Sequence, residues 1–309
     1  LTVIVFILML LALVLAHEAG HFFMARRAGC KVEEFAFGFP PRLWSFTKNG
    51  TQYSFNLLPI GGYVKIEGED MQESEPGPNS FASKSVLWRL AILVAGVSMN
   101  VVLAAALLSW QAGIGVPTLV TDNNANEVRD LKTFIVDVDE GSPAMNVGLK
   151  QFDRIVSIGN IVDPTINQVI HEVDNNLGRD LVLEIERQGQ HKTFIAEPRV
   201  RAPLEEGALG ISLQMTGLEK TPWWKAPWAG VKRTGQALTL IVGEFGSLMH
   251  GLVTQQKISG AVAGPIGIAV YTNEMTNLGL SYILEFAALI SLNLAIINIL
   301  PIPALDGGR

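Results

Sequence analysis

Two histidines four residues apart, with a glutamate beside the first, form the pattern in this sequence that is best suited to chemistry. They are His17, Glu18 and His21, in the pentad His-Glu-Ala-Gly-His. On an α-helix, residues i and i+4 lie on one face, so both imidazoles can bind one Zn²⁺ ion. The intervening carboxylate can then accept a proton from a water that the metal activates. The spacing therefore predicts a zinc site with Glu18 as its catalytic base.

The pentad lies inside an apolar run. Residues 1–16 are all apolar except Thr2, and a helix over 1–25 would be roughly 37 Å long, enough to cross a bilayer. Ionisable groups in hydrocarbon are costly and usually functional, although a chance pentad in a membrane anchor is the alternative. The run has no basic start and no cleavage site of a signal peptide. We therefore expect 1–25 to be retained as the first transmembrane helix.

Composition points to a membrane protein. Of the 309 residues, 49% are hydrophobic and 17% are charged, and the mean hydropathy is +0.31. The net charge of −6 offers no basic surface, so a nucleic-acid partner is excluded. The single cysteine, Cys30, excludes an internal disulfide and a cysteine-based zinc finger. We predict a polytopic α-helical membrane protein with a β-hairpin region and one inserted α+β domain.

Two further apolar segments, 86–112 and 280–309, are predicted to be the second and third transmembrane helices, and the bilayer is therefore a partner of the chain. Basic residues flank the loop 26–85, which places it in the cytoplasm by the positive-inside rule. The first basic residue beyond the second span is Arg129, so the insertion is expected to be extracytoplasmic. The chain lacks an initial Met and stops directly after an apolar segment, so we expect a fragment at both ends.

The cytoplasmic loop is rich in β-forming residues. Runs at 33–39, 43–47 and 52–57 predict strands, and Asn49-Gly50 predicts the turn of a hairpin. The following Gly61-Gly62-Tyr63 segment lets a backbone approach another chain closely. A plain hairpin tucked under the helices is the alternative. Residues 71–79 are predicted to be a linker.

A third metal ligand is needed, because a catalytic zinc takes three protein ligands and leaves one position for water. Asp306 follows the third span, and its depth in the membrane should match that of the pentad. Pro301 and Pro303 should end the helix, and Gly307-Gly308 allows a tight backbone behind the carboxylate. An Asp-Gly turn at a membrane exit is the alternative. His250 is a second possible ligand, but nothing pairs with it nearby.

Small and amide residues recur within the spans. Gly96 and Asn100 lie on one face of the second span, where they permit close helix approach and offer an amide across the interface. The alternative is that this amide only holds the helices together. Asn293 and Asn298 in the third span could bind a substrate backbone or bridge helices.

The insertion at 118–216 resembles a bacterial PDZ domain. A strand at 134–138 is followed by Gly141-Ser142-Pro143-Ala144, by Gly148-Leu149 and by the 152–160 segment, in the order usual for such domains. Phe152 replaces the usual Gly, and Gly159-Asn160 reverses the usual turn. Strands at 180–187 and 192–196 should complete the domain.

Leu209-Gly210-Ile211 is similar to the carboxylate-binding loop of PDZ domains, which implies binding of a peptide or a new C-terminus. A size filter is the alternative role. His171 and His191 in this domain are interpreted as surface residues.

After the domain, residues 220–256 are predicted to be an amphipathic, membrane-associated helical region. Trp223, Trp224 and Trp228 suit the headgroup layer of a bilayer. Residues 257–279 are predicted to be a connecting loop.

Together these motifs resemble the site-2 protease family of intramembrane zinc metalloproteases, in the bacterial branch of regulator-of-sigma-factor proteases. The likeness implies that His17, His21 and Asp306 bind Zn²⁺ and that Glu18 is the base. It further implies substrate contacts, which we expect at Gly61, Gly62, Tyr63, Asn100 and Asn298. The implied substrates are single-span membrane proteins, such as anti-sigma factors already trimmed outside. The implied location is the bacterial inner membrane, with the active site toward the cytoplasm. The likeness also implies a fourth transmembrane span beyond Arg309.

Two other functions stay open at this point. A membrane-tethered PDZ receptor with a structural zinc would need no Glu18. A membrane-anchored peptidase of soluble peptides would not need its pentad inside a span.

Overall fold

The computed structural model describes residues 2–69, 77–120, 128–187, 189–201, 203, 207–254, 265–301 and 305–308. The chain forms two compact units, Leu1–Gln111 with Trp223–Arg309, and Ala112–Pro222. Most of the predicted linker, residues 71–76, lies outside the described residues. So do residues 257–264 of the predicted connecting loop. The two units are treated separately below.

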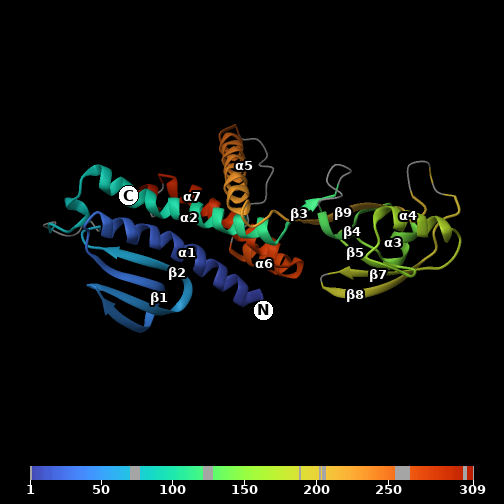
Figure 1. Ribbon diagram of the computed structural model, residues 1–309, viewed down its shortest axis with the longest axis horizontal. Helices are drawn as coiled ribbons and strands as arrows, with labels where there is room; N and C mark the ends of the chain where they lie inside the picture. The colour runs from blue at the N-terminus through green and yellow to red at the C-terminus, as the bar shows by residue number, and fades with distance from the viewer. Residues whose placement is uncertain are drawn as a thin grey trace. The chain divides into compact units, whose positions relative to one another are not determined.

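The first unit is built on α1 (Thr2–Arg27), α2 (Val86–Ile114) and α7 (Leu280–Ile299). Within the described part of the chain, these three helices are long and apolar enough to cross a membrane. They agree with the three predicted spans and run alongside one another (Figure 1). Met9 and Leu13 of α1 pack with Ala287 of α7, and a second cluster joins α2 to α7. In each of the three helices, less than half of the apolar stretch is buried within the protein, as suits helices that are surrounded by lipid.

Glycines bring α1 and α2 into close contact. A Cβ atom on Gly20 would lie 2.3 Å from the carbonyl oxygen of Ala95, and one on Gly96 would reach the rings of His17 and His21. Any larger residue at either position would push the helices apart. The predicted role of Gly96 in close helix approach therefore agrees with the structure.

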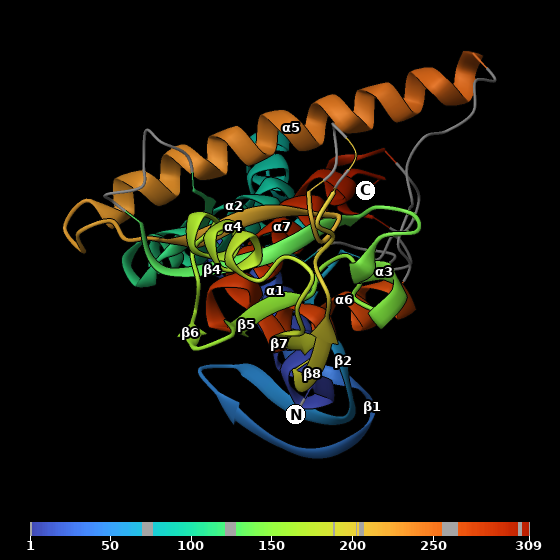
Figure 2. The same ribbon diagram turned by 90° about the vertical axis from the view of Figure 1, so that its right-hand side faces the viewer.

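Helix α5 (Ala226–Thr254) runs across the direction of α1 and α2 in both views (Figures 1 and 2). One of its faces packs on α2 and α7 through Ala237, Leu238 and Ile241. Arg233 of α5 donates to the side chains of Gln111 on α2 and Glu285 on α7. These polar contacts tie the crossing helix to the spans. The tryptophans predicted to lie in the headgroup layer, Trp223, Trp224 and Trp228, are all exposed.

Helix α6 (Pro265–Leu278) corrects one prediction. We predicted a connecting loop over the whole of 257–279, because Gly264-Pro265-Ile266-Gly267 appeared to break the chain. Proline is well tolerated in the first turn of a helix, so Pro265 begins α6 instead. Ile268 of α6 packs against the cluster formed by Met9, Leu13 and Ala287.

Strands β1 (Val32–Lys48) and β2 (Thr51–Ile66) form the predicted hairpin, a long curved ribbon (Figure 2). Asn49 and Gly50 have φ values of 53° and 79°, as a tight hairpin turn requires. Both strands bend, so Phe35 pairs with Tyr53 on one side and with Val64 on the other. The Gly61–Ile66 stretch therefore lies at an edge of the ribbon.

The ribbon is anchored to the end of α1. Phe22 and Ala25 of α1 form a buried cluster with Val32, Phe35 and Ile66 of the ribbon. This apolar contact fixes the edge of the ribbon relative to the helix that carries the pentad.

The second unit holds a seven-stranded sheet in the order β3-β9-β4-β5-β7-β8, with β6 paired to β5. Its strands are β3 (Val116–Leu119), β4 (Val128–Val138), β5 (Arg154–Ile158), β6 (Ile161–Val162), β7 (Leu181–Arg187), β8 (Gln190–Ala196) and β9 (Ile211–Glu219). Helices α3 (Pro143–Val147) and α4 (Ile166–Asn175) pack on the sheet through Ala144, Val169 and Val173. The strands predicted at 134–138, 180–187 and 192–196 all appear.

A buried ion pair supports this unit. Asp153 is fully buried, and its two carboxylate oxygens accept hydrogen bonds of 2.6 Å from Nε and Nη2 of Arg187. Those bonds raise the pKa of the Arg187 guanidinium, so the charge persists. Arg187 also donates to the carbonyl of Gly148 at 2.8 Å, which ties β7 to the end of α3.

Phe152 adopts a backbone conformation that favours glycine. Its φ is 69° and its side chain is 74% exposed, so the strain is not offset by burial of the ring. We expect Phe152→Gly to stabilise this unit by about 0.5–1 kcal/mol, because relief of strain exceeds the added freedom of the unfolded chain. Hydrogen exchange of β4 and β5 amides in the full-length chain measures the change.

Phe152→Ala is the matched control, since it removes the ring and keeps the Cβ atom that causes the strain. Equal stability of the Gly and Ala variants would contradict this explanation.

Candidate metal centre

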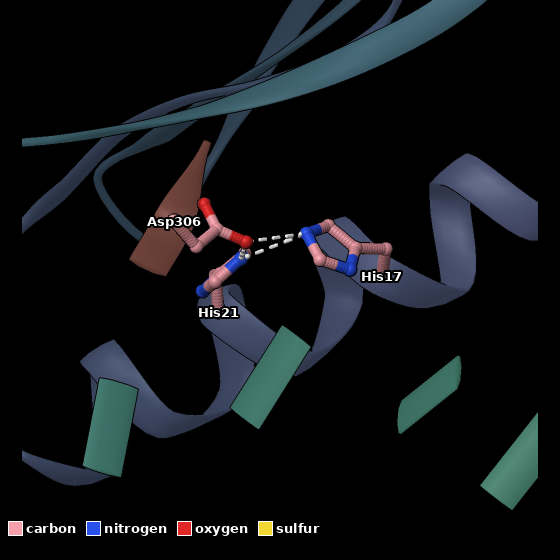
Figure 3. Close-up of side chains that lie close together, drawn as sticks. All are labelled: His17, His21 and Asp306. Atoms are coloured by element: carbon pink, nitrogen blue, oxygen red, sulfur yellow. Dashed lines mark hydrogen bonds and ion pairs between the residues drawn. The ribbon is translucent and has the colours of Figure 1, made fainter. Parts of the chain in front are cut away.

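Three side chains from opposite ends of the chain meet at one point (Figure 3). His17 and His21 project from α1, and Asp306 comes from the short helix η2 (Asp306–Gly308) after α7. The Asp306 Oδ2 atom lies 2.8 Å from His17 Nε2 and 3.2 Å from His21 Nε2, and the two Nε2 atoms are 3.2 Å apart. The structure therefore brings together the three residues that the sequence predicted as ligands.

This donor set fits a catalytic zinc ion. All three ligand atoms lie within 4.8 Å of one another, and together they provide two imidazole nitrogens and one carboxylate oxygen. Two histidines and a carboxylate are among the ligand sets that hold catalytic zinc. His17 and His21 are 6% and 8% exposed, so the group is shielded from bulk water.

The end of α7 explains how Asp306 reaches the site. The helix stops at Ile299, and the amide of Leu300 caps it by donating to the carbonyl of Ile297. A Cβ atom on Gly307 would lie 2.3 Å from the carbonyl of Ile299, so the chain can return past the helix end only with glycine there. Pro303 lies outside the described residues.

Helix α2 supplies partners for the far sides of both rings. His21 Nδ1 lies 2.9 Å from the carbonyl oxygen of Ile92, and His17 Nδ1 lies 3.2 Å from the side-chain amide of Asn100. The carbonyl of Ile92 carries no signal in its side chain, so sequence patterns could not have indicated it.

Other predicted residues lie at varying distances from the centre. The side-chain nitrogen of Asn298 is 3.4 Å from His17 Nε2, whereas Asn293 donates to the carbonyl of Leu289 in its own helix. His171, His191 and His250 are exposed, and none belongs to a metal-binding group among the described residues. The interpretation of His171 and His191 as surface residues agrees with their exposure.

The ribbon edge runs beside the pentad. The backbone of Val64 is close enough to the Glu18 carboxylate to interact with it electrostatically. A Cβ atom on Gly62 would lie 3.7 Å from side-chain atoms of Val14 and Leu15 on α1. Gly62 is thus close to α1, while the predicted contact of Gly61, Gly62 and Tyr63 with substrate stays a prediction.

The Tyr63 hydroxyl lies near the Glu34 and Arg42 side chains of the ribbon. Partial burial and the Glu34 carboxylate raise the pKa of Tyr63, whereas Arg42 acts to lower it. Glu34 in turn accepts from Arg42 at 2.7 Å and from the hydroxyl of Ser54. This network stiffens the ribbon next to the candidate metal centre.

Removal of the carboxylate should weaken metal binding. We expect purified Asp306→Ala protein to hold much less zinc than wild type, because two imidazoles would remain as the only protein ligands of the set. Atomic absorption of dialysed protein measures the content. Asp163→Ala, which changes an exposed carboxylate far along the chain, is the control. An unchanged zinc content in Asp306→Ala would contradict the three-ligand scheme.

Substitution of Gly96 should reduce zinc binding as the loss of a ligand does. Its missing Cβ would lie 2.3 Å from His21 Nε2 and 2.9 Å from His17 Cε1. We therefore expect Gly96→Ala to lose zinc although it changes no ligand. Gly243→Ala, on a helix of the same unit with no heavy atom within 4 Å of the added Cβ, should keep wild-type zinc content. Normal zinc content in Gly96→Ala would show that the two helices can separate at little cost.

Comparison with known proteins supports this description. The model of peptidase family M50 matches residues 5–309. A candidate zinc metalloprotease of Clostridium acetobutylicum is 33% identical, with 99% of this chain and 84% of that protein aligned. Zinc metalloprotease RasP of Oceanobacillus iheyensis is 30% identical over 100% of this chain and 88% of its own length. Protease RseP of Yersinia pestis is 30% identical over 98% of this chain and 88% of its own length. The chain therefore belongs to peptidase family M50, the site-2 protease family that its motifs resemble.

Proposed function

We propose that this protein is an intramembrane zinc metalloprotease that hydrolyses peptide bonds within or near the transmembrane segments of single-span membrane proteins. The meeting of His17, His21 and Asp306 beside Glu18, among helices long enough to cross a membrane, carries this proposal. Membership of family M50 and the names of its relatives RasP and RseP support the metal and the reaction.

The chemistry requires one metal ion and one base. Zn²⁺ held by His17, His21 and Asp306 would supply a Lewis acid that polarises the scissile carbonyl and makes a water nucleophilic near neutral pH. Glu18 takes the proton from that water as its oxygen bonds to the carbonyl carbon. The same carboxylate then gives the proton to the amide nitrogen as the C–N bond breaks. No covalent bond to the protein forms.

Substrate must be unwound before it can be cut. A peptide bond in a transmembrane helix is covered by the hydrogen bonds of its own helix, and lipid offers no replacement for them. The Gly61–Ile66 edge lies beside Glu18 and presents backbone groups that an extended substrate segment could pair with. Asn298, close to His17, is proposed to hold the substrate backbone near the metal.

We infer that the 118–216 segment is a PDZ domain on the extracytoplasmic side, with the active site toward the cytoplasm. The order of strands, the α3 and α4 helices and the Leu209-Gly210 turn before β9 support the domain type. The basic residues around the 26–85 loop support the orientation. The domain would bind a peptide or a new C-terminus, or would exclude substrates with large outer domains. Anti-sigma factors trimmed outside are the proposed substrate class.

A purely structural zinc in a PDZ receptor is disfavoured. Structural sites close all four positions with protein ligands, whereas the group found among the described residues has three. A base beside the ligands would also have no purpose there.

Glu18→Gln should keep zinc and lose activity. Since Glu18 is not among the proposed ligands, metal content should equal wild type, while cleavage should fall by about 10²–10⁴-fold without the general base. The assay follows cleavage of a truncated single-span membrane protein in detergent, beside a soluble peptide of the same sequence. A chelator should stop cleavage, and added Zn²⁺ should restore it.

Glu244→Gln, the same change at an exposed position of α5, is the control. Cleavage by Glu18→Gln at the wild-type rate would refute the proposed mechanism. Cleavage of the soluble peptide alone would favour a membrane-anchored peptidase of soluble substrates.

A further inference from the structure

A stripe of three α2 residues faces the two histidines of α1. Ile92, Gly96 and Asn100 are spaced four residues apart, which places them on one face of the helix. Gly96 lets the helices touch, and the residues on either side of it reach the far sides of the imidazole rings. Asn100 therefore lies next to His17 and Ile92 next to His21, with Gly96 between them.

The ring nitrogens have two kinds of polar partner. Both Nε2 atoms lie within hydrogen-bonding distance of Asp306, and both Nδ1 atoms have their polar partner on α2. A neutral imidazole that binds a metal through Nε2 carries its proton on Nδ1, so Nδ1 must donate a hydrogen bond. For His21 the acceptor is the carbonyl of Ile92 at 2.9 Å. For His17 Nδ1, the only polar partner on α2 among the described contacts is the side-chain amide of Asn100.

As placed, the Asn100 amide points its donor at His17 and leaves its acceptor without a partner among the described residues. Its Nδ2 atom, a donor, lies 3.2 Å from His17 Nδ1, whereas its Oδ1 atom is buried and has no hydrogen-bond partner in the described part of the chain. An amide and its flipped form occupy nearly the same space. A half-turn of the amide would bring Oδ1 to the Nδ1–H of His17. The same half-turn would give the buried oxygen its missing partner.

We propose that Asn100 is a positioning residue, whose side-chain oxygen accepts the Nδ1–H of His17 and so presents Nε2 to the metal. This inference rests on the proposed role of His17 as a zinc ligand. Asn100 is 0% exposed, and its backbone carbonyl accepts a hydrogen bond of 2.9 Å from the Ser291 hydroxyl on α7. Helices α2 and α7 therefore both hold Asn100 in place.

This role differs from the two that the sequence suggested. We predicted Asn100 to contact substrate, but a fully buried side chain on the far side of His17 has no exposed atom to offer. As helix glue, the amide would bridge to backbone groups of another helix, whereas its nearest polar partner is a metal-site ring.

Zinc affinity measured on the full chain tests the proposal without any need for turnover. Purified protein in detergent competes with a chelator for Zn²⁺, and each variant is first checked for a single symmetric elution peak. Asn100→Leu keeps the volume and removes the acceptor, so affinity should fall about 10–100-fold. Asn100→Asp supplies only acceptors and should keep affinity in the wild-type range. Asn293→Leu, which removes an exposed amide of α7 that donates within its own helix, is the control and should bind zinc normally.

The variants separate positioning from mere packing. If Asn100 served packing alone, Asn100→Asp would lower zinc affinity as much as Asn100→Leu, because it buries an acid. That result would overturn the proposal. Wild-type affinity in Asn100→Leu would overturn it as well, provided that His17→Ala loses zinc. If His17→Ala also binds zinc normally, the proposed metal centre itself is refuted.

Discussion

The close crossing of α1 and α2 is the constraint on which the rest of the structure depends. Two imidazoles can lie between apolar helices only where the opposing helix offers almost no side chain, and Gly20 and Gly96 create that space. The crossing also brings the α2 backbone and Asn100 within reach of the rings. One packing contact thus makes room for the polar groups and supplies their partners. Small residues at helix crossings are the general means of such approach in membranes.

Polar groups in an apolar bundle must be paired, because an unpaired group there costs several kcal/mol. The structure meets this need from two sides of the histidines. Helix α2 provides the polar partners of the Nδ1 atoms, and Asp306 provides that of the Nε2 atoms. Near the other end of α2 the same rule applies to Arg233, Gln111 and Glu285, which join α5, α2 and α7 in one network. The spans are therefore fixed by a few polar contacts within surfaces that are otherwise uniformly apolar.

Apolar packing holds the β-ribbon and the second unit. The ribbon shares its buried cluster with α1, whereas the second unit has a core of its own. The ribbon is fastened to α1 through Phe22 and Ala25, and its free edge consequently lies beside Glu18. The second unit folds around a separate cluster of aliphatic residues and a buried Asp153–Arg187 pair. The second unit and the unit that carries the candidate metal centre thus have separate cores.

The sequence by itself determined the local features: the pentad spacing, the three apolar spans, the Asn49-Gly50 turn and most strands of the insertion. These depend on periodicity and turn chemistry over a few residues. Depth in the membrane also pointed to Asp306 as the third member of the group. The predicted loop was wrong over Pro265–Leu278, where Pro265 begins α6. Only the tertiary structure decided the partners of Asn100, the use of the Ile92 carbonyl and the edge position of Gly61–Ile66. The physical reason is that helices in lipid are apolar on every side, so no periodic pattern marks which face meets which neighbour.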